Sequence, residues 1–261
     1  MTGRIFRNLT SALLGTLLLW GCGETHLPEG RSPRLQTLPL TRGEFPVRIY
    51  EAEGAARGVI VFGSGDGGWK SFEDRSCAAL ARAGWRVVGW DCREYADPKL
   101  GPYGRDTLER DLDVMARQAV PGGVLLYAGY STGAEQAVAA AARSASGKGD
   151  FPRPSGLLLI APGSRGRCGI TFSDLMGLTP RGPGSFSLAE LAPELGTVPV
   201  VQIHGTLDPL DSTAWLVSLQ GKHRLITFPG TGHFFGDADS VFLNALINGA
   251  VWLSPTFRPR S

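Results

Sequence analysis

The apolar positions of this chain gather in six short runs, most of which end at or beside glycine, proline or aspartate. The runs cover residues 58–63, 85–91, 123–130, 156–162, 198–205 and 223–230. Near-continuous apolarity over six to eight residues is typical of a strand that is buried on both faces. The runs therefore predict the strands of a mostly parallel sheet.

Helical patterns lie between several of these strands. Residues 106–109 (DTLE) have the form of a capping box, and the helix they would open places apolar side chains on one face, at Leu108, Leu112, Met115 and Val120. Residues 134–143 are rich in alanine, and residues 241–253 form a further apolar-faced pattern. Strands that alternate with helices predict an α/β fold with helices on both faces of the sheet, in one domain over residues 46–253.

Residues 163–186 interrupt this alternation. They contain six glycines and two prolines, and they follow directly after one of the predicted strands. A long irregular connection at such a position often carries a lid or a substrate-binding loop. We therefore treat residues 163–186 as a candidate lid within the domain.

The N-terminal segment has the features of a targeting signal. Arg4 and Arg7 precede an apolar run at residues 13–20 that is too short to span a bilayer. Residues 19–22 (LWGC) resemble a lipobox, in which the cysteine, here Cys22, is lipidated. We expect a signal peptide over 1–21, a tether with an entry strand over 22–45, a tail over 254–261 and a periplasmic, membrane-anchored lipoprotein. The alternative is an ordinary signal peptide with an incidental cysteine.

Composition and charge narrow the classes of partner. The chain is 43% hydrophobic, which suffices for a full core, and its formal net charge is +2. Arg4 and Arg7 account for this excess, and no run of basic residues forms a patch, so nucleic acid is not an expected partner. Three further cysteines leave alternatives open: either Cys77 and Cys92 form a disulfide, or these two and Cys168 are all core thiols.

The sharpest chemical motif is G-x-S-x-G at residues 129–133 (GYSTG). It follows a predicted buried strand and precedes the alanine-rich helix. This is the context of a nucleophile elbow, where a strained turn exposes the serine hydroxyl above the sheet. Ser131 is therefore the candidate nucleophile. A structural Gly/Ser turn is the alternative.

A serine nucleophile needs a base and an orienting acid. His233 follows the last strand in a glycine-rich loop, whereas His204 and His223 lie at the ends of strands and His26 lies in the tether. Asp208 lies just beyond the preceding strand, and the order serine, aspartate, histidine is that of α/β-hydrolases. We expect His233 to be the base and Asp208 the acid. Asp211 is the second candidate acid, and either aspartate could instead serve a turn or a cap.

The glycine-rich loop at residues 63–69 (GSGDGGW) completes the predicted site. Its amides and that of Thr132 are candidate oxyanion donors, with Ser64 preferred in the loop and Gly65 second. Such a loop could instead hold phosphate, but the chain lacks both G-K-[ST] and a G-x-G-x-x-G that opens a helix. We therefore expect neither a cofactor nor a metal ion.

Several of these segments resemble the bacterial VirJ/AcvB virulence-protein family. The resemblance rests on residues 64–69 (SGDGGW), 87–91 (VVGWD), 93–95 (REY), 129–134 (GYSTGA) and 229–234 (PGTGHF). It implies a periplasmic protein of α/β-hydrolase fold. It also implies a link to type IV secretion in some members, and hydrolysis of the aminoacyl ester of lysyl-phosphatidylglycerol.

That substrate suggests further candidate contacts. A cationic lysyl group calls for an acidic partner, for which Asp66 and Glu135 are candidates, and Trp69 and Tyr130 are candidate substrate-binding aromatics. A turn residue and a solvated helix residue are the alternative roles of the two acids. Two other functions stay open for the chain: a generic carboxylesterase similar to dienelactone hydrolases, and a non-catalytic lipoprotein that assists secretion.

Overall fold

The computed structural model describes residues 32–117, 123–147, 151–236 and 238–254. Eight strands form one sheet in the order β1-β2-β4-β3-β5-β6-β9-β10. The strands from β4 to β10 in this order run parallel to one another, while β2 is antiparallel to both β1 and β4. Their bounds are β1 Arg34–Leu40, β2 Gly43–Tyr50, β3 Gly58–Gly63, β4 Trp85–Trp90, β5 Val124–Tyr130, β6 Gly156–Ile160, β9 Val200–Gly205 and β10 His223–Phe228. The predicted α/β class with a mostly parallel sheet is confirmed.

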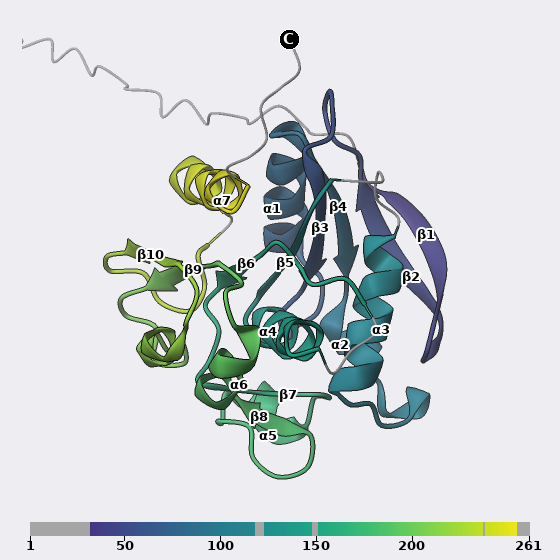
Figure 1. Cartoon of the computed structure of the whole chain (residues 1–261), viewed down its shortest axis with the longest axis vertical. Helices are drawn as coiled ribbons and strands as arrows, with labels where there is room; N and C mark the ends of the chain where they lie inside the picture. Colours follow the sequence, from purple (N-terminus) through teal and green to yellow (C-terminus); the bar gives the residue numbers. More distant parts are fainter. Residues whose placement is uncertain (1–31, 118–122, 148–150, 237, 255–261) are drawn as a thin grey trace, which may run out of the picture.

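Helices cover both faces of this sheet (Figure 1). One face carries α3 (Arg105–Ala116), α4 (Thr132–Ala145) and α6 (Leu188–Leu195), and the other carries α1 (Ser71–Arg82) and α7 (Ser240–Trp252). Each face buries its own cluster of apolar side chains against the sheet. The parallel strands therefore have both faces covered, which is why their sequences read as continuous apolar runs.

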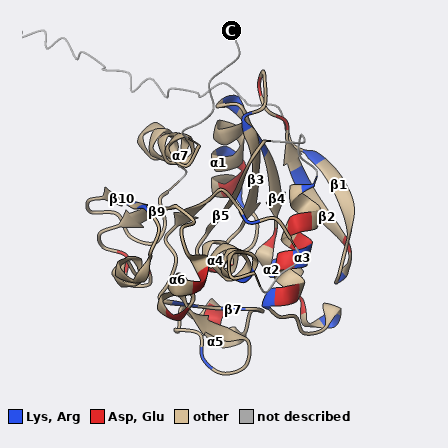
Figure 2. Cartoon of the chain, viewed as in Figure 1, with Lys and Arg blue, Asp and Glu red and all other residues tan. Residues whose placement is uncertain are grey.

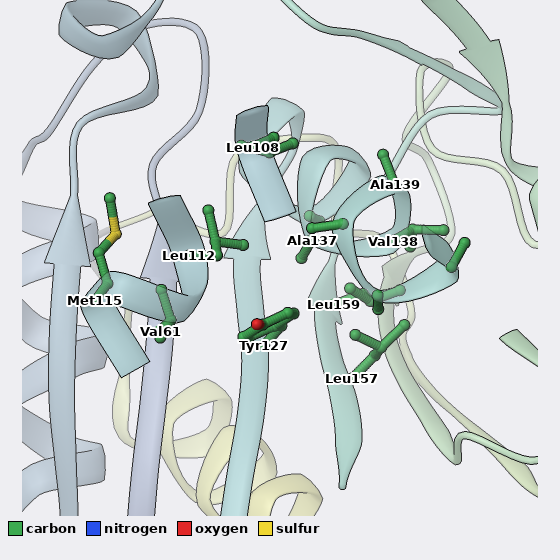
Figure 3. Packing of buried hydrophobic residues seen from close by; sticks show 14 of the residues in the cluster. Val61, Leu108, Leu112, Met115, Tyr127, Ala137, Val138, Ala139, Leu157 and Leu159 are labelled. Carbon is green, nitrogen blue, oxygen red and sulfur yellow. The ribbon is translucent and has the colours of Figure 1, made fainter. Parts of the chain in front are cut away.

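The packing of α3 and α4 shows how the site-bearing strands are supported. Leu108, Leu112 and Met115 are buried between α3 and the sheet, as the helical spacing predicts (Figure 3). The face of α4 toward the sheet is largely alanine, which lets this helix lie close to β5 and β3. The strand–helix junction at Ser131 is therefore fixed by a well-packed core.

Shorter elements lie at the carboxyl edge of the parallel strands. The 163–186 segment contains a two-stranded sheet of β7 (Arg165–Arg167) and β8 (Ser185–Ser187), with one helical turn, α5 (Phe172–Leu175), between them. The remaining short helices are α2 (Cys92–Tyr95), η1 (Pro98–Leu100) and η2 (Ala214–Ser218). The segment that sequence analysis reads as irregular is therefore partly ordered and lies outside the main sheet.

The structure gives bounds within residues 22–45, where a tether and an entry strand were expected. The strand β1 and the first residues of β2 lie there, so the sheet begins at Arg34. Along β2 the side chains alternate, with Phe45, Val47 and Ile49 buried. Such a half-buried antiparallel strand contains fewer apolar residues than a central strand, so the sequence pattern that predicts it is weaker.

One local prediction is also corrected, and of the two alternatives left open for the cysteines one fits the structure. The helix α3 begins at Arg105 with Gly104 as its N-cap, so Asp106 lies in the first turn and the expected capping box does not form. Cys77, Cys92 and Cys168 are free thiols. Cys77 and Cys92 belong to the apolar clusters on opposite faces of the sheet, which separates them too far for a disulfide.

The predicted signal peptide, Cys22 and the tail after residue 254 lie outside the described residues. Within the described ranges, no helix is both long and apolar enough to cross a membrane. The same ranges hold no group of three or more histidine, cysteine, aspartate or glutamate side chains arranged to bind a metal ion.

Candidate active site

Ser131 occupies a strained turn between β5 and α4. Its φ of 50° and ψ of −118° lie in a region that residues other than glycine rarely adopt. The neighbouring strand β6 holds it there, because the Ser131 N–H donates to the Ile160 carbonyl at 2.9 Å. A backbone forced into such a conformation at the end of a strand points the hydroxyl away from the sheet.

The two glycines of the motif are required by close backbone contacts. A Cβ on Gly129 would lie 2.4 Å from the Gly133 carbonyl carbon, and a Cβ on Gly133 would lie 2.4 Å from the Gly63 oxygen. Neither position has room for a side chain. The spacing G-x-S-x-G therefore lets β5, α4 and β3 approach one another around Ser131.

His233 and Asp208 reach Ser131 from the loops after β10 and β9. The His233 Nε2 atom lies 3.2 Å from Ser131 Oγ, and His233 Nδ1 lies 2.7 Å from Asp208 Oδ2. The Asp208 side chain is fully buried and that of His233 nearly so. Serine, imidazole and carboxylate therefore form one continuous hydrogen-bonded series, the arrangement of a catalytic triad.

Close packing and hydrogen bonds hold the two loops. Gly205 has no room for a side chain, since a Cβ there would lie 2.6 Å from the carbonyl oxygens of Thr231 and Gly232. The second carboxylate oxygen of Asp208 accepts the Leu210 N–H at 2.8 Å. The acid therefore has both oxygens engaged and one orientation toward the imidazole.

Asp211, the second candidate acid, has a different histidine partner. Its Oδ2 lies 2.5 Å from His204 Nδ1, and its Oδ1 accepts the Gln202 amide at 2.7 Å. Burial raises the pKa of Asp211 to about 6, and the hydrogen bond and charge of His204 oppose that rise. Because its oxygens are engaged away from His233, Asp211 holds the loop and Asp208 supplies the triad contact.

Tyr130 contacts the histidine directly. Its ring lies 5.3 Å from the His233 ring, and its hydroxyl donates to the His233 carbonyl at 3.1 Å. Tyr130 also lines the cavity in front of Ser131. The residue that sequence analysis proposes as a substrate contact therefore also positions the base.

The structure corrects the predicted oxyanion donors. The Ser64 N–H donates to the Trp90 carbonyl at 3.1 Å, and Ser64 is fully buried. Burial raises the pKa of Glu73, and hydrogen bonds from backbone amides, Gly65 among them, oppose the rise, so the Gly65 N–H faces that carboxylate. The amide after these two, that of Asp66, donates to no acceptor in the described part of the chain and lies in the cavity wall.

The other predicted donor fits the site. Thr132 is the first residue of α4, where backbone N–H groups have no acceptor within the helix. It lines the same cavity as Asp66 and follows Ser131 directly. The amides of Thr132 and Asp66 are therefore the pair available to a developing oxyanion.

The nucleophile opens into a cavity of about 890 Å³. Ser131 and His233 form part of its wall, and the 163–186 segment forms another part, with side chains that include Arg165 and Leu178. A volume of this size holds a substrate of several hundred daltons. The candidate lid thus contributes to the substrate space, although sequence alone gave no contacts for it.

Both candidate substrate-binding acids, Glu135 and Asp66, line this cavity, together with Glu73, Asp174 and Asp211. Glu135 is buried beneath the 163–186 segment, and its Oε1 accepts the Gly163 N–H at 2.9 Å. Burial raises the pKa of Glu135 to about 8, and the nearby charges of Asp66 and Asp174 add to the rise. Burial likewise raises the pKa of Asp66. Glu135 is therefore not a solvated helix residue.

Trp69, by contrast, lies outside the cavity wall. Its indole lies across Gly89 of β4, where a Cβ would come within 2.2 Å of the ring. The indole N–H donates to Asp74 at 2.8 Å, and the Trp69 backbone N–H donates to Asp91 at 2.9 Å. These contacts fix the glycine-rich loop, so Trp69 is a structural residue and its prediction as a substrate contact is wrong.

An ion pair that was not predicted from the sequence orders the 163–186 segment. Arg167 donates to Asp174 at 2.9 Å and to the carbonyls of Arg181 and Pro183. Asp174 in turn caps α5 through Thr171. The spacing of Thr171 and Asp174 is a capping-box signal that could have been read, whereas the role of Arg167 depends on contacts distant in sequence.

Comparisons with known proteins identify a family and a fold. The model of the family described as bacterial virulence protein (VirJ) matches residues 58–249. A search of the curated proteins found no match.

The solved structures include many similar chains. A putative dienelactone hydrolase from Klebsiella pneumoniae is 13% identical at a TM-score of 0.62, with 86% of this chain and 98% of that chain covered. A hyperthermophilic esterase from Pyrobaculum calidifontis is 18% identical at 0.61, with 87% and 86% covered. Est1E from Butyrivibrio proteoclasticus is 12% identical at 0.61, with 86% and 99% covered. At these identities the likeness establishes an α/β-hydrolase-like fold.

Proposed function

The chain belongs to the bacterial virulence protein (VirJ) family, and from this membership and the Ser131–His233–Asp208 contacts we propose that it is a serine hydrolase of carboxylic esters. The observation that carries the proposal is the hydrogen-bonded series itself. A non-catalytic secretion lipoprotein has no need of three aligned side chains on three loops. Esterase and hydrolase neighbours in fold agree with the same chemistry.

The reaction follows from the contacts. His233 Nε2 accepts the Ser131 proton as the Oγ attacks the ester carbonyl, and Asp208 stabilises the imidazolium that forms. The amides of Thr132 and Asp66 bind the oxyanion. His233 then returns the proton to the departing alkoxide, leaving an acyl-serine. Water, deprotonated by the same imidazole, releases the acid.

The finer proposal concerns the acyl group. We assign the aminoacyl ester of lysyl-phosphatidylglycerol as the substrate, at the periplasmic membrane surface. The resemblance of residues 64–69 and 129–134 to the family supports this substrate. The cavity supports it independently, because Glu135 and Asp66 lie beside the nucleophile. An ammonium group bound there would favour the ionised form of these carboxyls and would be attracted in return.

A matched pair of variants tests the hydrolase. We expect Ser131→Ala to lose release of free lysine from lysyl-phosphatidylglycerol vesicles by about 10⁴-fold or more, because the attacking oxygen is gone. Ser240→Ala, at an exposed serine on α7, is the control and keeps full activity. Turnover by Ser131→Ala near that of the parent would refute the serine mechanism.

The generic carboxylesterase is the second candidate, favoured by the esterases among the fold neighbours. Glu135→Gln separates the two. For a lysyl ester we expect KM to rise about tenfold or more while kcat for a neutral short-chain ester stays within about twofold. Brisk cleavage of the neutral ester with no lysine release would favour the generic enzyme.

A further inference from the structure

Large apolar side chains are exposed mainly around the cavity mouth. Of thirteen such side chains in the described ranges, seven lie on the 163–186 segment or on the two loops that carry the triad acid and base, and six of the seven, without Leu207, are considered together. We call these six the apolar rim: Phe172, Leu175, Met176, Leu178, Leu210 and Phe234. An apolar surface of this kind, concentrated in one place, usually marks a site of interaction.

The rim is continuous with the active-site cavity. Leu175, Leu178, Leu210 and Phe234 also line the cavity. Phe172 and Met176 extend the surface outward from there, and they are 78% and 64% exposed. Whatever covers the rim therefore also covers part of the wall of the cavity that holds Ser131.

Internal bonds fix the rim in this exposed state. Arg167 and Asp174 form their ion pair beneath α5, and Asp174 also accepts from the Thr171 hydroxyl. The side chains of Arg167 and Asp174 thus face inward, while Phe172 and Met176 are left outside. A segment that exists only to close the cavity would bury its apolar side chains instead.

Basic side chains accompany the rim. Lys70, Arg93 and Arg165 line the cavity beside its five acids, and Arg181 is exposed on the loop after α5. Figure 2 shows basic positions on β7 and on this loop. Apolar side chains flanked by arginine and lysine are the combination that binds an anionic lipid surface.

The predicted anchor can reach the same surface. In the sheet, Arg34 of β1 lies opposite Ile49 of β2, and Ile49 lies opposite Val88 of β4. Because β4 ends at Trp90, β1 starts at a level two residues before the carboxyl end of β4. Four strand spacings of about 4.8 Å place β1 roughly 20 Å from β5. Cys22 precedes Arg34 by twelve positions, a length of chain that spans at most about 40 Å when extended.

We propose that the apolar rim docks on an anionic phospholipid bilayer, so that the cavity opens onto the lipid headgroups. The proposal rests on the proposed function for its biological sense, because a lipid-linked ester lies at that surface. Its physical basis is separate. Phe172, Met176 and Leu178 would enter the headgroup region, and Arg181 would meet lipid phosphates.

The test measures partition onto vesicles of phosphatidylglycerol and phosphatidylethanolamine. The full chain carries Cys22→Ser, which removes the predicted lipid acceptor, and Ser131→Ala, which stops hydrolysis. We compare Phe172→Gln/Met176→Gln with Val217→Gln/Val241→Gln, a control pair that is equally exposed but lies outside the rim. None of these four residues lines the cavity.

We expect the rim pair to weaken partition at least about tenfold, and the control pair less than about twofold. With Ser131 restored, both pairs should cleave a soluble short-chain ester at the parental rate, which shows that the fold is intact. Equal partition for the two pairs would overturn the proposal. The proposal would also be overturned if light scattering showed a dimer that is lost in Phe172→Gln/Met176→Gln. The rim would then bind a second copy of this chain instead of a bilayer.

The outcomes separate docking from catalysis. A protein that partitions through the rim but releases no lysine refutes the proposed substrate and leaves the docking surface standing. The opposite outcome is release of lysine from detergent-dispersed lipid together with equal vesicle partition of the parent and of Phe172→Gln/Met176→Gln. That result would support the proposed function and refute the docking surface.

Discussion

Glu135→Gln should stabilise the protein, and more so as the pH rises. Glu135 is buried on α4 with one oxygen accepting the Gly163 N–H and two acids nearby, Asp66 and Asp174. Burial raises its pKa from 4.5 to about 8. Glutamine has the same shape and keeps an oxygen that accepts the Gly163 N–H. Because its amide does not ionise, it removes the cost of burying a carboxylate.

The magnitude follows from linkage. With a folded pKa above the unfolded one, the folded state binds more protons between the two values, so the contribution of Glu135 is fully present below about pH 4.5 and is lost as the pH rises through about 8. The loss amounts to less than about 1 kcal/mol at pH 5 and about 4 kcal/mol at pH 8. The advantage of Glu135→Gln should therefore grow by about 3 kcal/mol over this interval.

Urea unfolding at pH 5 and pH 8 measures this difference directly. By thermal unfolding, about 3 kcal/mol corresponds to roughly 6–12 °C in Tm for a domain of this size. The matched control is Glu190→Gln, an exposed glutamate in the first turn of α6. Its free energy of unfolding relative to the parent should change by less than about 0.5 kcal/mol at either pH.

One result would refute the reasoning. If Glu135→Gln has the same advantage at pH 5 as at pH 8, the carboxyl ionises as readily in the folded chain as in the unfolded one. Glu135 would then have access to water or to a cation, and it could not act as a group whose charge waits for an ammonium ligand.

Three further predictions concern the elbow, the acid and the anchor. Asp208→Asn should lower kcat by about 10⁴-fold, whereas Asp211→Asn should lower it less than about tenfold, as steady-state kinetics on a short-chain ester would show. Equal losses would mean that the acid is misassigned. Gly133→Ala should abolish soluble expression or lower Tm steeply, because its Cβ would lie 2.4 Å from a backbone oxygen. Intact-mass measurement of the mature protein should find a diacylglyceryl addition at Cys22, and an unmodified N-terminus elsewhere would indicate ordinary secretion.

The sequence predicted the central architecture because that part has a strong local signal. Strands buried on both faces read as apolar runs, and the elbow requires glycine at Gly129 and Gly133 for contacts that hold in every such turn. The edge strands β1 and β2 were harder, since only alternate residues are buried there. The same contrast explains why residues 22–45 yielded only an entry strand without bounds, while the parallel strands from β3 to β10 in the main sheet were found.

The glycine-rich loop shows where local reading stops. Its composition indicates that amides can turn inward, but which amide is free depends on partners distant in sequence. Ser64 is engaged by Trp90, and Gly65 faces Glu73, which leaves Asp66. Likewise the sequence predicts Trp69 as a substrate contact, because it does not show that the ring packs on Gly89 of β4.

The two histidine–aspartate pairs make the same point for the acid. His204 with Asp211 and His233 with Asp208 have the same chemistry and similar distances, and both aspartates lie on the loop after β9. The two pairs differ in what each contacts outside the pair. That of His233 lies 3.2 Å from the Ser131 hydroxyl, whereas Asp211 is joined to Gln202 and so ties its pair to the sheet. One pair can therefore move a proton to or from the nucleophile, and the other can only hold the loop on which the first depends.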